Sequence, residues 1–481
     1  MKEFDVIVIG AGLSGIAAGH YLGANCPQKS FCILEGRDAI GGTWDLFRYP
    51  GIRSDSDMHT LGYSFYPWND PKAIADGPSI REYVRETAAH YGLDSKIEFG
   101  TRVTSLSWDS SKALWEITAQ KDGDEVKFLA NFVWCCSGYY SYDQAYTPNF
   151  EGVDTFEGEF IHPQFWPEEL DYSNKRVVVI GSGATAVTLV PELAKKAAHV
   201  VMLQRTPTYV MSLPSVDTIS EKFRGLLGDN VGSDLTRWKN ISVAALFFGL
   251  SKRYPQMVRK YLIDALKEKI GHKVDVERHF SPPYNPWEQR VCFVPDDDLF
   301  DALVSEKAEV VTDKIERFLP NGILLKSGQI LEADIVVSAT GLKVEMLGGA
   351  KIFVDSEELK PGRHMLYKGT MVSDVPNLAI SIGYTNASWT LKCELIGRWV
   401  TRLLNEMDAK GAKVAVAPRE EGVSPTPLVD FNSGYIRRAA GAVPTQGDRR
   451  PWKLYQNYFL DVVSLGHAPI DDGHLEFGGK E

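Results

Sequence analysis

Two copies of one pattern constrain the fold of this 481-residue chain more than any other feature. In each copy a short apolar segment runs into a glycine-rich turn and then into a stretch with helical spacing, first over residues 4–22 and again over residues 176–193. Glycine lets the backbone turn tightly and approach a pyrophosphate, which then binds the positive end of the following helix. The sequence therefore predicts an α/β protein with two Rossmann-like dinucleotide-binding domains.

The first unit has the spacing of a nucleotide site on both sides of its turn. Four residues of the turn are candidate cofactor ligands: Gly10, Gly12, Ser14 and Gly15. A second apolar strand, residues 31–34, delivers Glu35 twenty residues after Gly15, where an acid accepts hydrogen bonds from ribose hydroxyls. A lone glycine pattern is a weak signal, but the two strands and the acid at this spacing favour nucleotide binding over a purely structural turn.

The second unit points to a phosphorylated nucleotide. Its turn contributes the candidate ligands Gly181, Gly183, Ala184, Thr185 and Ala186. The strand that follows, residues 200–204, ends in Arg205 and Thr206, at the position where an NAD site would carry an acid. A guanidinium grips a 2′-phosphate through two parallel hydrogen bonds, so this unit predicts NADPH rather than NADH. The alternative is that Arg205 simply faces solvent.

These units divide the chain into two predicted dinucleotide-binding domains. The first begins at residue 1, and residues 151–339, which hold the second glycine turn, are predicted to form the NADP-binding domain. Within the first part, residues 97–129 alternate between apolar and polar side chains, which indicates an antiparallel meander.

Residues 213–280 interrupt the α/β alternation and predict a helical insertion in the second domain. Seven of its apolar side chains recur at helical spacing: Met257, Val258, Tyr261, Leu262, Ala265, Leu266 and Ile270. Residues 251–273 also hold seven Lys or Arg against two Asp or Glu, beside the apolar run 243–250. A solvated helix face over a core is the simpler interpretation, and peripheral contact with a membrane surface is the other.

Two further stretches resemble the fingerprints of one enzyme family. Between the two units lies FEGEFIHPQFWP, residues 156–167, and shortly after Glu35 lies GGTWDLFRYPGIRSD, residues 41–55. A merely flexible linker would be rich in Gly and Ser instead of holding a His, aromatic residues and two prolines. Both stretches resemble the patterns of the Baeyer-Villiger monooxygenases, flavoproteins that insert an oxygen atom beside a ketone carbonyl.

The resemblance implies FAD and NADPH as cofactors, and conversion of ketones to esters or lactones with O2 through a C4a-peroxyflavin. Oxygenation of sulfides and thioamides at sulfur is implied as well. The resemblance also implies a discontinuous FAD-binding domain, residues 1–150 and 340–481, on either side of the NADP-binding domain, residues 151–339. Arg290 would be the catalytic cation beside the flavin, oriented by Asp55, because arginine keeps its charge and donates a fixed fork of hydrogen bonds. The other implied residues are Gly42, Thr43, Trp44, Val103, Gly138 and Asn386 for the cofactor, and Gly158, His162 and Trp166 for coupling the domains.

Composition argues against several other classes of protein. The net charge of −11 and pI near 5.5 argue against nucleic-acid binding, which requires a basic surface. The six cysteines have no metal-ligand or Cys-x-x-Cys spacing, so reduced thiols in a cytoplasmic protein and no metal site are expected. The chain opens without the pattern of a signal peptide, and its longest apolar run is too short to span a bilayer.

Three other functions remain open for comparison. A flavin-containing monooxygenase acting only on nitrogen or sulfur would usually lack Trp166-Pro167 and Arg290. A pyridine nucleotide-disulfide reductase needs a redox-active cysteine pair, whereas Cys135 and Cys136 are adjacent on a predicted strand and point to opposite faces. A non-catalytic nucleotide sensor would not need Asp55 and Arg290.

Overall fold

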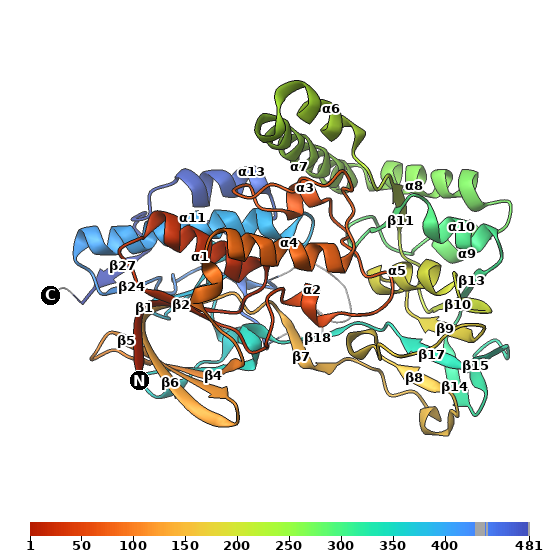
Figure 1. Ribbon diagram of the computed structural model, residues 1–481, viewed down its shortest axis with the longest axis horizontal. Helices are drawn as coiled ribbons and strands as arrows, with labels where there is room; N and C mark the ends of the chain where they lie inside the picture. Colours follow the sequence, from red (N-terminus) through yellow and green to blue (C-terminus); the bar gives the residue numbers. More distant parts are fainter. Residues whose placement is uncertain (429–437, 439–440, 480–481) are drawn as a thin grey trace.

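The computed structural model describes residues 1–428, 438 and 441–479 and has two lobes, each built on its own sheet (Figure 1). In the first lobe, parallel strands follow the order β3-β2-β1-β6-β23. Their bounds are β1 (Lys2–Ile9), β2 (Phe31–Leu34), β3 (Ile97–Glu98), β6 (Asp124–Cys135) and β23 (Leu378–Ile380). Both faces of this sheet are covered, which explains the continuous apolar runs in its strands.

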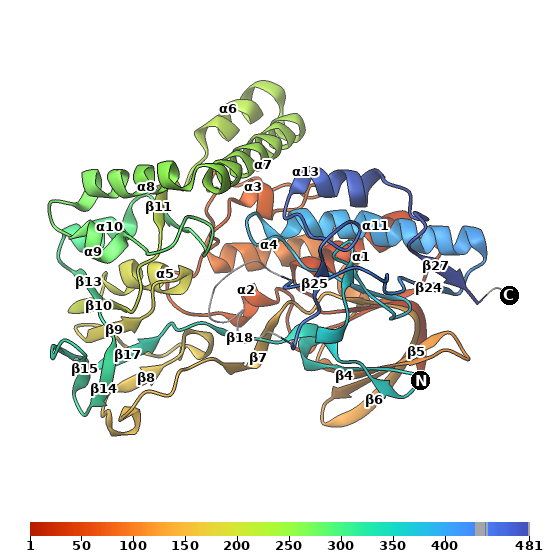
Figure 2. The ribbon, with the colours of Figure 1, turned by 180° about the vertical axis from the view of Figure 1, so that it is seen from behind.

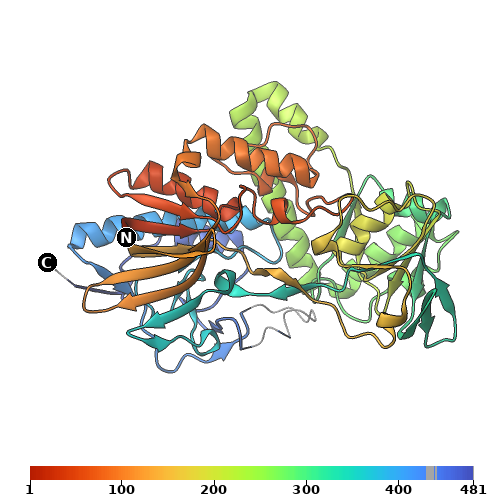
Figure 3. The same ribbon diagram turned by 60° about the horizontal axis from the view of Figure 1, so that its bottom comes forward.

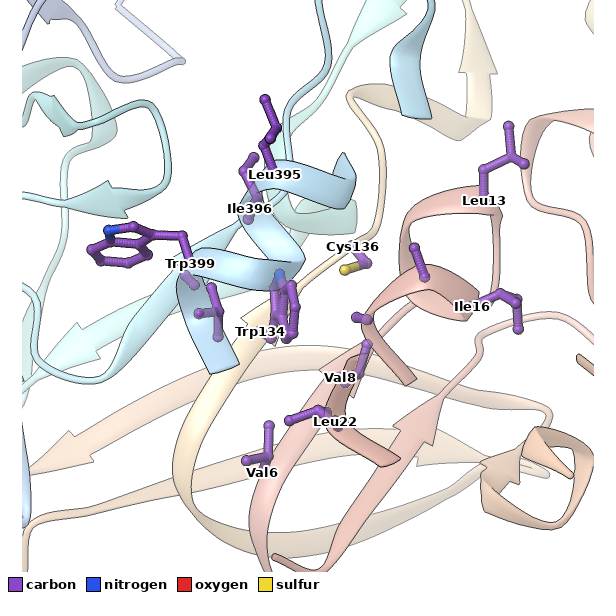
Figure 4. Close-up of a cluster of buried hydrophobic side chains, with 14 of the residues drawn as sticks. Val6, Val8, Leu13, Ile16, Leu22, Trp134, Cys136, Leu395, Ile396 and Trp399 are labelled. Carbon is purple, nitrogen blue, oxygen red and sulfur yellow. The ribbon is translucent and has the colours of Figure 1, made fainter. Parts of the chain in front are cut away.

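An antiparallel meander covers one face of the first sheet, and helices cover the other. The predicted meander over residues 97–129 is confirmed, because β4 pairs with β5 and β5 with the first half of β6 in antiparallel register. Figure 4 shows the opposite core, a buried cluster that includes Ile16 of α1, Ile396 of α11 and Val8 of β1. The elements are β4 (Thr101–Asp109), β5 (Leu114–Lys121), β19 (Lys351–Val354), β20 (Glu357–Glu358), α1 (Leu13–Asn25), α4 (Gly77–His90) and α11 (Trp389–Lys410).

The second lobe has an all-parallel sheet of order β13-β10-β9-β17-β8. Its strands are β8 (Glu159–Ile161), β9 (Arg176–Ile180), β10 (His199–Gln204), β13 (Ala308–Thr312) and β17 (Ile335–Ser338). Helices α5 (Ala184–Leu193) and α10 (Asp298–Val304) accompany it, with β11 (Val210–Leu213), β12 (Cys292–Pro295), β14 (Ile315–Leu319), β15 (Gly322–Leu325) and β16 (Ile330–Glu332). The predicted fold with two dinucleotide-binding sheets is therefore confirmed.

The chain passes between the lobes along a two-stranded ribbon. Strand β7 (Tyr140–Ala145) leaves the first lobe, β18 (Leu342–Val344) returns to it, and the two pair in antiparallel fashion. Figure 3 shows this ribbon between the two sheets. Shorter elements are α2 (Thr43–Leu46), α3 (Met58–Leu61), α13 (Tyr458–Asp461), β21 (Leu366–Tyr367), β22 (Met371–Val372), β24 (Val414–Val416), β25 (Pro425–Thr426), β26 (Gln446–Gly447) and β27 (Glu476–Gly478).

The helical insertion lies across both lobes (Figure 2). It consists of α6 (Thr218–Leu227), α7 (Asp229–Arg253), α8 (Pro255–Ile270) and α9 (Val276–Phe280). Helix α8 packs on the core of the second lobe through Val258, Leu262 and Leu266, whereas α7 packs against α11 of the first lobe through Ile241. Met257 and Tyr261, which share the helical spacing, are 56% and 65% exposed and lie on the face of α8 away from the second lobe's core.

Candidate active site

The first glycine turn joins β1 to α1 with a backbone that requires glycine. Gly10 has φ +100°, and a Cβ on Gly15 would overlap the carbonyl oxygen of Gly10. Within the described residues no side chain caps the start of α1, so its backbone N–H groups remain available to an anion. This turn also lies against the turn at Gly42, whose Cα is 3.4 Å from where a Cβ on Gly12 would stand.

Glu35 follows β2 and is buried beside this turn. Its two carboxylate oxygens accept hydrogen bonds from the backbone N–H groups of Ala11 (2.7 Å) and Arg37 (2.8 Å). Burial raises the pKa of the Glu35 carboxyl, an effect that these N–H groups oppose. Because a carboxylate oxygen accepts more than one hydrogen bond, Glu35 keeps acceptor capacity toward a hydroxyl in the site.

A cavity of about 1110 Å³ begins at this turn and extends toward the second lobe. Eleven predicted site residues line it, from both lobes: Gly10, Gly12, Ser14, Glu35, Gly42, Thr43, Trp44, Asp55, Val103, Gly138 and Arg290. Gly15 is not in the wall; it is the glycine on which the close approach of turn and helix depends. The cavity is large enough for a dinucleotide-sized ligand together with a small second molecule.

Asp55 and Arg290 meet in the wall of this cavity, although they are separated by 235 positions in the chain. The Nε and Nη2 atoms of Arg290 lie 3.2 Å and 3.4 Å from the two carboxylate oxygens of Asp55. Both side chains keep solvent access, with 44% of the Arg290 and 30% of the Asp55 side chain exposed. The carboxylate thus orients the guanidinium fork while part of that fork still faces the open side.

The second glycine turn joins β9 to α5 and repeats the construction of the first. Gly181 has φ +144°, and a Cβ there would overlap the carbonyl oxygen of Ala339. Ser182 Oγ donates to the carbonyl of Thr206 (3.0 Å), and Arg205 is exposed beyond the end of β10. None of the predicted residues of this unit lines the cavity described above, since they gather at the carboxyl edge of the second sheet: Gly181, Gly183, Ala184, Thr185, Ala186, Arg205 and Thr206.

Residues 156–167, between the two glycine units, link the two segments by which the chain passes between the lobes. His162 Nδ1 accepts from the backbone N–H of Gln164 (3.1 Å), so Nε2 carries the proton and donates to the carbonyl of Gly341 (3.1 Å). Burial lowers the pKa of His162, which keeps the ring neutral at pH 7. Gly158 allows the backbone to pass Asp334, where a Cβ would overlap a carbonyl, and Trp166 is buried in the second lobe's core.

Asn386 is placed differently from the other predicted cofactor residues. It does not line the cavity, and its side-chain amide donates to the carbonyl of Gln456 (2.9 Å). Its neighbour Trp389 does line the cavity, stacks on Tyr139 and donates from Nε1 to Ser14 Oγ (2.8 Å). Residues 385 and 386 are therefore held by Gln456 of the C-terminal segment, which lines the cavity together with Trp389.

Two charged residues of the site region, Lys392 and Asp461, were not anticipated from the sequence. Lys392 and Tyr384 line the cavity, and both contact the buried carboxylate of Asp461. A lysine within the helical pattern of residues 389–410 looks like an exposed position, and nothing in the sequence links it to an aspartate 69 positions away. Only the tertiary arrangement brings them together.

Two sheets of the dinucleotide-binding type, with a large cavity at the first and Arg290 of the second lobe in its wall, are the construction of oxidoreductases that use two nucleotides. Residues 3–414 match the model of the flavin-binding monooxygenase-like family. The chain is 48% identical to the FAD-containing monooxygenase EthA of Mycolicibacterium smegmatis over 99% of this chain and 97% of that protein. It is 49% identical to the probable FAD-binding monooxygenase AlmA of an Acinetobacter species, over 99% and 96% of the two chains.

Solved structures agree at the level of the fold. A steroid monooxygenase bound to NADP superimposes with a TM-score of 0.77 at 22% identity, covering 99% of both chains. A cyclohexanone monooxygenase with bound ε-caprolactone gives 0.75 at 21%, covering 99% and 100%. The chain belongs to the flavin-binding monooxygenase-like family and is an enzyme of that family.

Gly15→Ala is expected to yield protein without bound flavin, because the new methyl group would force the turn away from the start of α1. The matched control is Gly23→Ala on the same helix, where a Cβ meets no atom within 4 Å and the change should be neutral or stabilising by roughly 0.5–1 kcal/mol. The ratio of flavin to protein absorbance in each purified variant measures the effect. A normal flavin content in Gly15→Ala would contradict the role given to this turn.

Proposed function

We propose that the chain is an FAD- and NADPH-dependent Baeyer-Villiger monooxygenase that converts ketones to esters or lactones with O2. It would also oxygenate sulfides and thioamides at sulfur. The observation that carries this proposal is the Arg290–Asp55 pair in the cavity wall. Adding an oxygen nucleophile to a ketone creates negative charge on oxygen, and a guanidinium held in place stabilises such charge without rearranging.

The residues at the first turn fit FAD. The backbone N–H groups at the start of α1 would hold the diphosphate, Glu35 the ribose hydroxyls, and the Gly42 turn the middle of the cofactor. Thr43, Trp44, Val103 and Gly138 are further FAD contacts in this proposal, since each lines the same cavity. When bound, FAD accepts a hydride from the nicotinamide and activates O2.

The second turn fits NADPH. Its backbone, residues 181–186, would hold the diphosphate, and Arg205 with Thr206 would hold the 2′-phosphate. We assign residues 1–150 and 340–481 to the FAD-binding domain and residues 151–339 to the NADP-binding domain. Gly158, His162 and Trp166 would then couple the domains by tying the two chain crossings together, which is a gating role separate from the chemistry.

Heteroatom oxygenation alone is the nearest alternative. A monooxygenase acting only on nitrogen or sulfur has no requirement for an oriented cation beside its oxygenating centre, whereas this cavity holds one. Disulfide reduction is disfavoured by the cysteines. Cys135 and Cys136 are buried in cores on opposite faces of the first sheet, and burial raises the pKa of Cys135 to about 12.

A single turnover tests the proposal. The protein is reduced with NADPH under anaerobic conditions and then mixed with ¹⁸O2 and an aryl ketone, and the product is analysed by mass spectrometry. An ester with one labelled oxygen is the expected product. Unchanged ketone across a panel of ketones, together with sulfoxide from a test sulfide, would replace the proposal with heteroatom oxygenation.

We also propose that the protein makes peripheral contact with a membrane through the α6–α7 hairpin. In the described residues no helix is long and apolar enough to cross a membrane. The hairpin projects from the body in Figure 1, and Leu226, Leu227 and Val231 at its tip are 82%, 50% and 53% exposed. The basic excess of residues 251–273 contributes less than its sequence suggests, because three of its lysines pair with acids elsewhere: Lys267 with Glu277, Lys269 with Asp297 and Lys273 with Glu306.

Leu226→Glu is expected to reduce the fraction of protein that co-sediments with phospholipid vesicles several-fold, since a charge at the tip opposes burial in the interface. Ile330→Glu is the matched control, because Ile330 is 52% exposed on β16, far from the hairpin in the chain. Equal sedimentation of both variants and the unmodified protein would exclude the hairpin as the contact. Flavin content serves as the check that the variants are folded.

A further inference from the structure

Lys392 is a buried cation in the wall of the candidate active site. It lies in the first turn of α11, and its side chain is only 5% exposed. Its Nζ atom lies 2.7 Å from Asp461 Oδ2, and the Tyr384 hydroxyl donates to the same oxygen, also at 2.7 Å. Lys392 and Tyr384 line the cavity, whereas Asp461 does not. Of the two charged members of this trio, the lysine is the one in the cavity wall, and its Nζ atom lies 3.5 Å from where a Cβ on the wall residue Gly369 would stand.

A second trio of the same construction exists away from the cavity wall. Lys368 Nζ lies 2.8 Å from Asp472 Oδ2, and the Tyr367 hydroxyl donates to that oxygen at 2.7 Å. In both trios the ammonium group lies 5.2 Å from the centre of the tyrosine ring. Lys368, Asp472 and Tyr367 do not line the cavity. Both trios hold the C-terminal segment on the first lobe. This structural role does not require a lysine in the cavity wall, because the second trio performs it away from the cavity.

The position of Lys392 on α11 adds to the effect of its charge. The helix begins at the cavity, where the Trp389 indole donates to Ser14 Oγ of the first glycine turn (2.8 Å). The N-terminal end of a long helix carries partial positive charge. The next charged residue of the helix, Glu394, is buried in a pair with Arg237 and does not line the cavity. The ammonium group and the helix end thus both make this wall positive.

We propose that Lys392 holds a fixed positive charge against the flavin ring system and stabilises its negatively charged reduced form. The proposal rests on the proposed placement of FAD in this cavity. Asp461 moderates the charge and keeps the lysine oriented, and Tyr384 withdraws part of the negative charge of Asp461 by donating to it. Lys392 is a positioning and electrostatic residue for the cofactor, distinct from Arg290, which faces the substrate's oxygen.

The test measures the equilibrium of the bound flavin with a reference redox dye. Lys392→Met is expected to lower the equilibrium constant for two-electron reduction at least tenfold, equivalent to about 30 mV. Asp461→Asn is expected to raise the same constant, because it leaves the lysine's charge less compensated. A purely structural role would shift both variants in one direction. Lys368→Met and Asp472→Asn are the matched controls and should stay within twofold of the unmodified protein.

The outcomes separate this inference from the proposed function. If the unmodified protein binds no FAD, the proposed function fails. If it binds FAD and Lys392→Met matches Lys368→Met in its reduction constant, the inference is overturned and the proposed function stands. Should Lys392→Met not fold, Lys392→Arg and the paired change Lys392→Met with Asp461→Asn replace it. Lys392→Arg should then have the same reduction constant as the unmodified protein, and the double variant should have a lower one. Equal constants in these two variants would overturn the inference.

Discussion

Replacing Arg290 with alanine will lower the rate of ketone oxygenation by about 10²–10³-fold, the loss seen when one preorganised donor to an oxyanion is removed. Flavin content and the rate of flavin reduction by NADPH should change only slightly, because the Arg290 side chain is paired with Asp55 and takes no part in the backbone of either glycine turn. The reducing equivalents should then appear as hydrogen peroxide. Ester formation, NADPH consumption and peroxide release, measured in one reaction, check all three expectations.

Two further variants define what Arg290 contributes. Arg290→Lys keeps the charge but loses the planar fork that faces both oxygens of Asp55, so part of the activity should return. Asp55→Asn removes the carboxylate that orients the fork and should fall between Arg290→Lys and Arg290→Ala. Equal ester formation by Arg290→Ala and the unmodified protein would show that the guanidinium has no part in oxygen insertion.

The two sheets could be predicted from the sequence because their signals are local. Gly10 and Gly181 stand at left-handed or crowded backbone positions that no other residue fills, and each follows a strand that is apolar on both faces. The meander was readable for the same reason, since alternation with period two records which face of a strand is buried. Such features depend on neighbours in sequence and not on how distant segments meet.

The residues that the sequence did not reveal depend on contacts between distant segments. Lys392 meets Asp461 only because α13 packs beside α11, and the Asn386 amide is engaged only because the C-terminal segment brings the Gln456 carbonyl to it. The Arg290–Asp55 contact likewise joins two lobes, and the sequence indicated it through a family resemblance instead of through spacing. Helical periodicity also failed to separate buried from exposed positions on α8, since Met257 lies outside the face that packs on the second lobe.

Nothing in the sequence indicated that α7 packs on the first lobe, because the insertion to which α7 belongs is part of the second domain. One side chain accounts for much of that placement. Arg237 is buried, with its Nη2 2.8 Å from Glu394 Oε2 and its Nη1 donating to the carbonyls of His59 (3.0 Å) and Gly62 (2.6 Å). The guanidinium thereby ties the insertion to both α3 and the start of α11 in the first lobe.

Arg237→Ala is therefore expected to destabilise the protein by about 3–5 kcal/mol, the usual result of removing one partner from a buried ion pair. Among the described residues, the buried Glu394 carboxylate would keep the hydrogen bond from the backbone N–H of Ser64, and the carbonyl groups of His59 and Gly62 would lose the guanidinium. Urea unfolding followed by tryptophan and flavin fluorescence measures the loss. Flavin release should precede the unfolding of the second lobe, because the broken contacts belong to the first.

Two comparisons distinguish this expectation from a general sensitivity of the insertion. Lys260→Ala on α8 removes an exposed ion pair with Asp264 and should leave the unfolding curve unchanged. Replacing both members of the buried pair, Arg237→Met with Glu394→Gln, removes the uncompensated charge and should be less damaging than Arg237→Ala alone, since an apolar or neutral substitute avoids the desolvation penalty. If Arg237→Ala unfolds at the same urea concentration as Lys260→Ala, the insertion is held on the first lobe by apolar packing around Ile241 instead of by the guanidinium.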